Sequence, residues 1–166
     1  MAIPRADYIK ALEALVGDAR RGLPEDVFHF VSRVTPLINV DLLIQDDRAR
    51  TLLTWRDDDF FGPGWHVPGG IIRYKESAAD RIRACGRAEL GADISPEPAP
   101  LAVLEDIGGQ ETRGHHVSLL YRCRLVTPPD EAKRAASDPP SPGQWRWHHG
   151  SPPDLLDMQR EYARFF

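Results

Sequence analysis

The hydrophobic and polar positions divide the chain into helical and extended segments, in an order typical of a mixed α/β layered domain. Apolar residues recur at helical spacing over 5–20 and again between Pro24 and Pro36, which predicts two N-terminal helices. A continuous apolar run at 37–44 is joined by a polar turn to a second run at 51–56. These two runs are predicted to be strands that pair as a hairpin.

The second half of the chain predicts one central helix and further strands. A short strand over 71–74 precedes a helix from Glu76 to Leu90, and Gly91 is placed to cap the end of that helix. Four further elements follow: strands at 101–107, 117–126 and 144–148, and a final amphipathic helix at 153–166. Because strands and helices do not alternate regularly, the order favours an α+β arrangement over a doubly wound parallel sheet.

Length, composition and charge describe one globular domain. The chain has 166 residues, 42% of them hydrophobic, and a formal net charge of −4, which gives no basic footprint for nucleic acid. No apolar stretch approaches the roughly 18–20 residues that cross a bilayer, and the N-terminus has no signal-peptide pattern. Cys85 and Cys123 lack the spacing of a disulfide framework or a zinc site. We therefore expect a cytoplasmic protein that binds neither nucleic acid nor membranes.

The predicted helix at 76–90 turns a carboxylate toward its apolar side. An advance of about 100° per residue places Glu89 on the same side as Ala78, Ile82 and Cys85, away from the charged positions of the helix. A carboxylate that points inward is costly unless a cation or strong hydrogen-bond donors meet it. The pattern therefore indicates either an ion pair with a buried arginine or a metal ligand.

Two nearby features favour the metal ligand. The helix follows the sequence Val67–Gly70, whose glycines let backbone carbonyls approach a ligand closely. Carbonyl and carboxylate oxygens together are the ligands of hard cations such as Mg²⁺ or Mn²⁺. Asp41 lies within an apolar strand and shares a face with Asn39, which indicates either a solvated strand face or a polar cluster at the bottom of a cleft.

The segment around this helix resembles the Nudix box. Gly70, Glu76, Glu89 and Gly91 stand at the positions of the box glycine, its first glutamate, its last glutamate and its final glycine. Of the three carboxylates that usually hold metal in the box, Glu89 alone is present, so the box is degenerate. The resemblance implies a Nudix-like mixed sheet sandwiched between helices. Residues 1–34 would then form a helical extension of that domain, which spans 35–166.

Further matches extend the resemblance to the GDP-mannose mannosyl hydrolases, which also lack two of the box carboxylates. The resemblance spans about residues 24–166 and rests on segments spread along the chain: Thr35–Leu37, Asp41, Arg56, Trp65–Gly70, Ala88–Gly91 and Trp145–Trp147. The family implies one divalent ion, Mg²⁺ or Mn²⁺, held by the Gly69 carbonyl and Glu89, where it neutralises a diphosphate leaving group. Asp41 would lie near the sugar or orient water.

The resemblance also implies how the substrate is bound. Arg56 would donate hydrogen bonds to the diphosphate of a GDP-mannose-like nucleotide sugar. This chain departs from the family at two further positions, where Arg73 would replace an arginine and His116 stands in place of a tyrosine. Water would attack the anomeric carbon of the sugar with inversion, and the family suggests a homodimer. Alternative hypotheses are a pyrophosphohydrolase that attacks phosphorus and a Nudix-fold module that binds nucleotides without turnover.

The loop that carries the general-base histidine of the family departs from the family pattern. Ser141 and Pro142 stand where the family has its metal-binding glutamine and that histidine. Gln144, His148 or His149 could take over after a shift of the loop. The adjacent pairs of histidines do not predict chelation, because neighbouring strand residues point to opposite faces.

Overall fold

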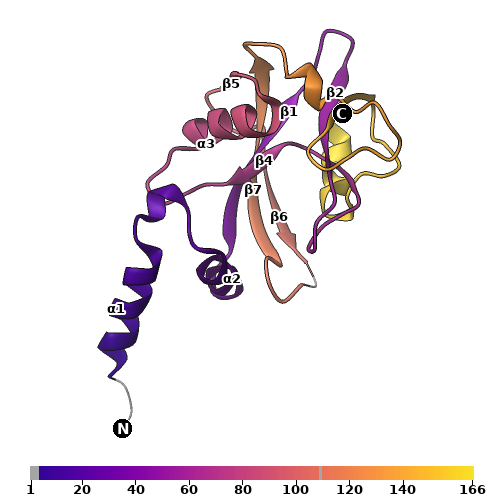
Figure 1. Ribbon diagram of the computed structural model, residues 1–166. Helices are drawn as coiled ribbons and strands as arrows, with labels where there is room; N and C mark the ends of the chain where they lie inside the picture. Colours follow the sequence, from indigo (N-terminus) through magenta and orange to yellow (C-terminus); the bar gives the residue numbers. More distant parts are fainter. Residues whose placement is uncertain (1–3, 109) are drawn as a thin grey trace.

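The computed structural model describes residues 4–108 and 110–166 and contains a mixed sheet, a smaller second sheet and helices around them (Figure 1). The helices and helical turns are α1 (Arg5–Val16), η1 (Ala19–Arg21), α2 (Glu25–Val34), α3 (Ala78–Cys85), η2 (Gly86–Leu90), η3 (Glu131–Lys133) and η4 (Asp157–Phe165). The strands are β1 (Leu37–Ile44), β2 (Arg50–Arg56), β3 (Gly64–His66), β4 (Gly69–Ile71), β5 (Ile94–Pro96), β6 (Ala102–Ile107), β7 (His115–Leu125) and β8 (Trp145–His149).

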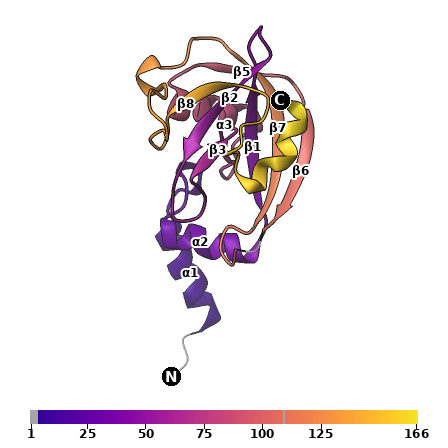
Figure 2. The same cartoon turned by 90° about the vertical axis from the view of Figure 1, so that its right-hand side faces the viewer.

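Parallel and antiparallel pairs coexist in the larger sheet, which confirms the predicted α+β fold class. Its strand order is β4-β1-β7-β5. β6 also pairs with β7, and Figure 2 shows these two strands side by side. The long strands β1 and β7 run parallel, from Leu37 opposite His116 to Ile44 opposite Cys123, and the other pairs are antiparallel. The smaller sheet has the order β3-β2-β8, and all its pairs are antiparallel.

The predicted hairpin between the first two strands is wrong. β1 and β2 meet in one isolated bridge, between Gln45 and Thr51, and then diverge into different sheets. The reason is the continuous burial of β1, in which Val40 to Ile44 are all buried. A strand that is apolar on both faces belongs in the middle of a sheet, and β1 accordingly lies between β4 and β7.

Two hydrophobic clusters meet at β1, because its alternate residues point to opposite faces. Val40, Leu42 and Ile44 pack with α3 and with Trp145, while Leu43 packs in a second cluster with β2, β3 and the C-terminal segment. Side chains of the two sheets and of the C-terminal turn fill this second cluster. β1 therefore contributes to both clusters and lies between them.

The helix that follows the paired glycines ends in a wider π-helical turn. Ser77 caps its start by accepting a hydrogen bond from the Asp80 amide, and α3 continues directly into η2. As predicted, Gly91 ends the helix in the left-handed conformation, with φ of 63°. A side chain at Gly86 would collide with Ile94, so glycine lets this turn approach β5 closely. Glu89 lies within the π-helical turn.

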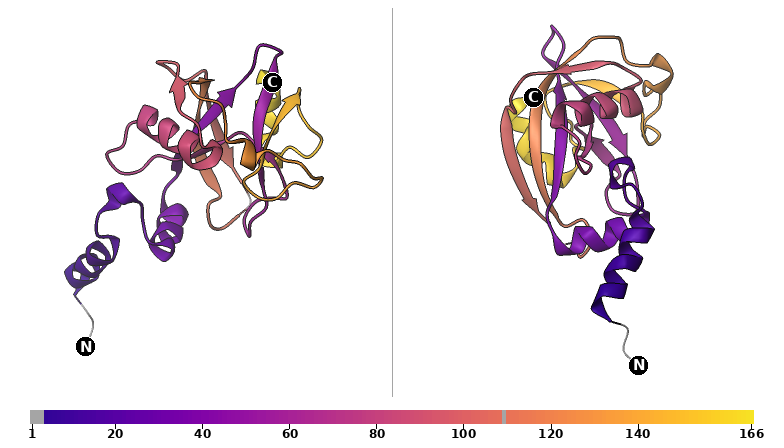
Figure 3. Two further views of the ribbon diagram at one scale, coloured as in Figure 1. Left: turned by 45° about the horizontal axis from the view of Figure 1, so that its top comes forward. Right: turned by 90° about the vertical axis from the view of Figure 1, so that its left-hand side faces the viewer.

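The two predicted N-terminal helices are present, although the first is shorter than predicted. α1 ends at Val16, is followed by the 3₁₀ turn η1, and has no buried residue. Figure 3 shows α1 extending away from the sheets, whereas α2 lies across one end of the larger sheet. The division into a helical extension (1–34) and a main domain (35–166) stays a prediction.

The final amphipathic helix predicted at 153–166 is present over Asp157–Phe165, as a 3₁₀ helix. Gln159 and Tyr162 are its buried residues, and they are three positions apart. Three residues per turn align such a pair on one face, so the 3₁₀ form directs both side chains inward. The strand predicted at 71–74 lies at Gly69–Ile71, and the short strands β3 and β5 were not predicted. Within the described residues, no helix has the length and apolar character needed to cross a membrane.

Candidate functional site

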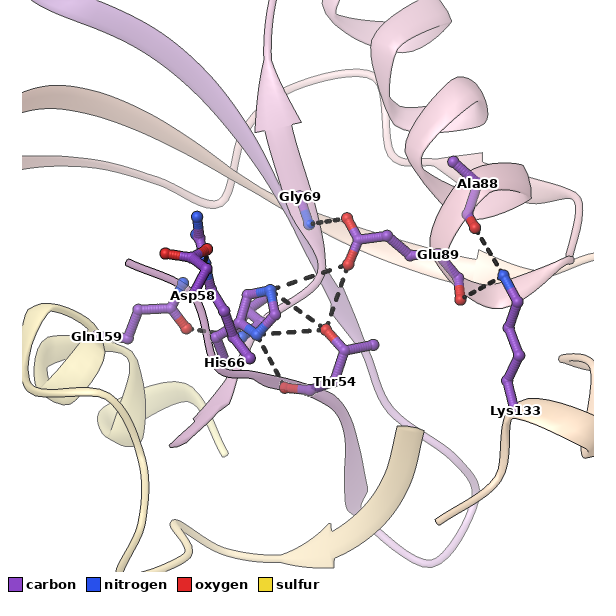
Figure 4. Close-up of polar contacts among 10 residues, drawn as sticks. Thr54, Asp58, His66, Gly69, Ala88, Glu89, Lys133 and Gln159 are labelled. Carbon is purple, nitrogen blue, oxygen red and sulfur yellow. Dashed lines mark hydrogen bonds and ion pairs between the residues drawn. The ribbon is translucent and has the colours of Figure 1, made fainter. Parts of the chain in front are cut away.

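A cavity of about 400 Å³ is bordered by both sheets, by the π-helical turn and by the C-terminal segment. Its charged and polar lining includes Asp41, Arg56, His66, Glu89 and Arg113. Gly69 and Pro142 also border it. Glu89, Asp41, Arg56 and Gly69, which are distant in sequence, therefore lie around one space. Figure 4 shows the polar contacts around Glu89.

Glu89 points into this cavity and accepts hydrogen bonds from two donors. The Gly69 amide donates to Oε1 over 3.0 Å, and the Thr54 hydroxyl donates to Oε2 over 3.3 Å. Burial raises the pKa of Glu89 to about 7, against the lowering effect of these hydrogen bonds. Among the described residues no lysine or arginine lies within 4.0 Å of its carboxylate. A bound cation would offset this cost of burial.

The buried arginine of the same helix has a different partner. Arg81 forms a two-point ion pair with Glu76, with nitrogen-to-oxygen distances of 2.8 and 2.9 Å. Lys133 contacts the helix end through its backbone, where Nζ donates to the carbonyls of Ala88 and Glu89. The helical wheel left an ion pair with a buried arginine open for Glu89, and no such pair forms among the described residues.

The backbone amide and carbonyl of Gly69 are not used in the pairing of β4 with β1. Leu42 donates to the Pro68 carbonyl over 2.8 Å, so the facing residues Asp41 and Gly69 form a non-hydrogen-bonded pair of the β1–β4 ladder. In such a pair the amide and the carbonyl both point away from the partner strand. The Gly69 amide reaches Glu89, and because β4 is an edge strand its carbonyl is available to a ligand.

Asp41 is a buried carboxyl group with a fixed orientation. The Tyr162 hydroxyl donates to Oδ2 over 2.6 Å, and 5% of the residue is exposed. Burial raises the pKa of Asp41 to about 6, while the hydrogen bonds from Tyr162 and Ser118 lower it. The residue therefore belongs to a buried polar cluster at the cavity wall, the second of the two interpretations that the sequence left open.

Removal of the Tyr162 hydroxyl leaves this carboxyl group short of a donor. We expect Tyr162→Phe to lower the free energy of unfolding by about 1–3 kcal/mol at pH 7.5, the usual cost of an unsatisfied buried polar group. Urea denaturation measures the effect. Tyr74→Phe is the matched control, because Tyr74 is 63% exposed and its loss should change stability little. Equal stability of both variants would contradict the role assigned to Tyr162.

His66 is a site residue that sequence reasoning did not identify. Its Nδ1 lies 2.8 Å from the Thr54 carbonyl, a contact that requires a proton on Nδ1 and leaves Nε2 as an acceptor. Nε2 lies 3.9 Å from Glu89 Oε2. Burial, aided by the charge of Arg56, lowers the pKa of His66 to about 4, so the ring is neutral at pH 7. No motif marks this position; its pairing opposite Thr54 places it here.

Arg56 and Arg113 border the cavity that contains Glu89, whereas Arg73 does not. Arg56 lines the cavity, is paired with Asp58, and packs its guanidinium over the Phe61 ring. Arg73 instead lines a separate apolar cavity of about 350 Å³ near Gly22. Arg113, which belongs to none of the sequence motifs, borders the same cavity as Arg56.

His116 is buried behind the cavity wall. It lines a small neighbouring cavity together with Asp41 and Ser118, and its ring meets Phe61 edge-on at 6.3 Å. Burial, followed by the charge of Arg113, lowers the pKa of His116. His116 and Arg73 are thus both outside the cavity that Arg56 and Glu89 share.

Gln144, His148 and His149, the possible replacements for the general base of the family, do not border the cavity. Gln144 accepts a hydrogen bond from the Ser141 amide, His148 packs against the Trp65 ring at 4.5 Å, and His149 is exposed. Pro142, at the position of the family histidine, borders the cavity with an apolar ring. No side chain in this loop brings a base to the site.

We expect burial of His148 to make the protein less stable in acid. Burial lowers the pKa of His148 to about 4 from its ordinary 6.5, so folding favours the neutral ring. The stabilisation is complete above pH 6.5 and is lost as the pH falls toward 4, where the unfolded chain binds a proton that the folded chain does not. We expect the melting temperature of His148→Gln to fall less than that of the wild type in this window. The exposed His149→Gln should retain the wild-type pH dependence.

The oxygen ligands in the cavity suit a divalent ion that the protein coordinates only in part. Among the described residues, no three His, Cys, Asp or Glu side chains form a metal cage. Glu89 and the Gly69 carbonyl supply hard oxygen ligands, and Asp41 adds negative charge nearby. Mg²⁺ keeps several waters or substrate phosphate oxygens as ligands, so this set fits it.

Comparison with solved structures decides the fold. The structure matches a MutT Nudix hydrolase from Burkholderia pseudomallei with a TM-score of 0.60 and 22% identity, covering 78% of this chain and 97% of that one. It matches an ADP-ribose pyrophosphatase from Streptococcus suis with a TM-score of 0.57 and 18% identity, covering 78% and 86% of the two chains. This chain has the Nudix fold. The Nudix-like architecture expected from the degenerate box is thereby confirmed.

Other comparisons extend the likeness beyond the Nudix core. A UDP-X diphosphatase structure matches with a TM-score of 0.57 and 17% identity and covers 95% of this chain and 89% of that one. Coverage of this extent includes most of the N-terminal helical region. No model of a known protein family matches the chain. The low-salt glycan biosynthesis protein Agl8 of Haloferax volcanii is 31% identical over 75 residues, which span 45% of this chain and about half, 47%, of that relative.

Proposed function

We propose that this Nudix-fold protein is a Mg²⁺-dependent hydrolase of a GDP-mannose-like nucleotide sugar. The observation that carries the proposal is the Glu89 carboxylate, which is held inside the cavity without a lysine or arginine partner, beside the Gly69 backbone edge and Arg56. The name of the Haloferax relative links it to glycan biosynthesis, and glycans are assembled from activated sugars, which supports a sugar-containing substrate.

Metal binding is assigned to the Glu89 carboxylate and the Gly69 carbonyl. A divalent ion held there, Mg²⁺ or Mn²⁺, would supply positive charge to the diphosphate leaving group. Tight β1–β4 pairing at Gly69 holds the carbonyl in place, and hydrogen bonds from Gly69 and Thr54 orient the carboxylate. These residues would need little rearrangement to accept the ion.

The other charged residues of the cavity bind and orient the substrate. Arg56 offers planar donors to the diphosphate, and Asp58 holds the guanidinium in position through an ion pair. Asp41, fixed by Tyr162, would lie near the sugar or orient a water molecule. Water would attack the anomeric carbon, the carbon–oxygen bond would break, and the nucleoside diphosphate would leave with the electron pair.

Attack at phosphorus is the second candidate reaction. Two matched structures are described as an ADP-ribose pyrophosphatase and a UDP-X diphosphatase, names that denote cleavage within the phosphate chain. A non-catalytic nucleotide-binding module is the third candidate, favoured by Pro142, which replaces the base of the family.

A turnover screen in ¹⁸O-labelled water separates the three candidates. The full chain is incubated with Mg²⁺ and GDP-mannose, other nucleotide sugars or nucleoside diphosphates, and the products are identified by NMR and mass spectrometry. We expect the label in the released sugar. Label in phosphate alone would establish attack at phosphorus, and nucleotide binding without turnover would establish the non-catalytic module.

The proposed partners are the small-molecule substrate and a second copy of the chain. Cys85 and Cys123 are both free, which agrees with the proposed cytoplasmic location. Light scattering coupled to size-exclusion chromatography tests the homodimer, and a mass near the 18.7 kDa of one chain would contradict it.

A further inference from the structure

Arg113 stands where two cavities meet. It borders the 400 Å³ cavity of Glu89 and also a larger cavity of about 660 Å³, which is lined by Phe60, Phe61 and the chain segment 153–158. Its backbone has a φ of 62°, a left-handed conformation that is uncommon outside glycine, and its amide donates to the Ser32 hydroxyl of α2 over 3.3 Å. This contact ties the backbone at Arg113 to α2.

Aromatic rings surround the guanidinium group of Arg113. Its central carbon lies 5.6, 5.2 and 5.1 Å from the ring centres of Phe28, Phe60 and Phe61. The Arg56 guanidinium carbon lies 4.6 Å from the same Phe61 ring. Two arginines therefore share one aromatic ring, and an anion bound beside them would offset the repulsion between their positive charges.

The two arginines differ in how their charge is balanced. Arg56 is paired with Asp58, whereas no carboxylate among the described residues lies within 4.0 Å of the Arg113 guanidinium. Burial and the charge of Arg56 lower the pKa of Arg113. Its Nε is buried and has no hydrogen-bond partner among the described residues. Buried polar atoms are normally paired, so this N–H group is a donor that a bound anion could satisfy.

We propose that Arg113 and Arg56 together bind the diphosphate of the substrate at the junction of the two cavities. The inference rests on the proposed function, because it assigns a new binding residue to the same site. The diphosphate would extend from the Glu89 end past Arg56 to Arg113. The group attached to the far phosphate would then lie in the larger cavity, against Phe60 and Phe61.

Titration with inorganic pyrophosphate tests the assignment without requiring turnover. Binding to the full chain is measured by isothermal titration calorimetry for the wild type, Arg113→Gln and Arg124→Gln. Arg124 is an exposed arginine of β7 that borders neither cavity. We expect Arg113→Gln to raise the Kd about tenfold to a hundredfold, the range for hydrogen bonds to a charged group. Arg124→Gln should bind like the wild type.

A second measurement separates binding from packing. Because Arg113→Gln removes a half-buried charge that has no carboxylate partner among the described residues, we expect its melting temperature to equal or exceed that of the wild type. A packing role predicts a lower melting temperature and an unchanged Kd for pyrophosphate. An unchanged Kd in a folded Arg113→Gln variant, or the absence of pyrophosphate binding to the wild type, would overturn the proposal.

Arg113→Lys provides a test that keeps the positive charge. Lysine lacks the planar set of donors, so we expect a smaller rise in Kd than for Arg113→Gln. The inference and the proposed function can fail separately. Pyrophosphate binding that depends on Arg113, without hydrolysis of any nucleotide sugar, would refute only the proposed function. Hydrolysis with wild-type KM in Arg113→Gln would refute only the role of Arg113.

Discussion

Glu89→Gln is expected to reduce metal-dependent hydrolysis by about two to three orders of magnitude, the effect seen when one preorganised electrostatic group is removed from an active site. Glutamine has nearly the same shape and still accepts the hydrogen bond from the Gly69 amide, but it lacks the negative charge that a divalent ion requires. We also expect stability to be retained or increased, because burial of the Glu89 carboxylate is unfavourable in the absence of a cation.

The measurements for this variant are the rate constant with the substrate found in the screen, the affinity for Mn²⁺ by electron paramagnetic resonance, and the melting temperature. Glu97→Gln is the matched control, since Glu97 is exposed and does not border the cavity. Unchanged Mn²⁺ affinity and unchanged activity in Glu89→Gln would show that the metal is bound elsewhere.

Gly69→Ala is expected to impair both stability and activity. The added methyl group would collide with Asp41 Oδ1 and with the Val40 carbonyl, which belong to the paired strand and cannot move away easily. Overpacking of this kind costs about 1–3 kcal/mol. The strand can relieve the collision only by moving away from β1, which displaces the carbonyl assigned to the metal. We therefore expect a lower urea midpoint together with reduced hydrolysis.

Gly108→Ala is the matched control for this substitution. A methyl group at Gly108 meets its nearest heavy atoms at 3.7 and 3.9 Å, which is ordinary van der Waals contact. Urea denaturation of both variants at pH 7.5 gives the comparison. If Gly69→Ala were as stable as Gly108→Ala and as active as the wild type, the close pairing of β4 with Asp41 would have no role in the site.

Helical and strand periodicity located the part of the site that depends on local structure. The spacing of residues along the helix predicted that Glu89 points inward. The period of two along the first strand predicted that Asp41 and Asn39 share one face. Both residues border the same cavity, because β1, β4 and the helix come together around the paired glycines. Periodicity could give the direction of each side chain but not the contacts between elements.

Contacts between segments far apart in the sequence determined the strand topology and the other residues around the cavity. The two strands predicted as a hairpin separated because β1 is apolar on both faces and required neighbours on each side. Arg73 and His116 lie outside the cavity, while Arg113, which belongs to no motif, lies at its edge because the β6–β7 loop is held by α2. Contacts of this kind join residues far apart in sequence and leave no local pattern.

The sequence by itself determined the α+β composition, the helix that carries Glu89 and the glycines that let the backbone approach a ligand, since each depends on residues within one or two turns. Only the tertiary structure decided which charges are neutralised. Arg81 is paired with Glu76 and Asp41 is held by Tyr162, whereas Glu89 and Arg113 have no partner of opposite charge among the described residues. Partial burial makes these two unpaired charges costly, which is why we propose them as the positions where a metal ion and a diphosphate bind.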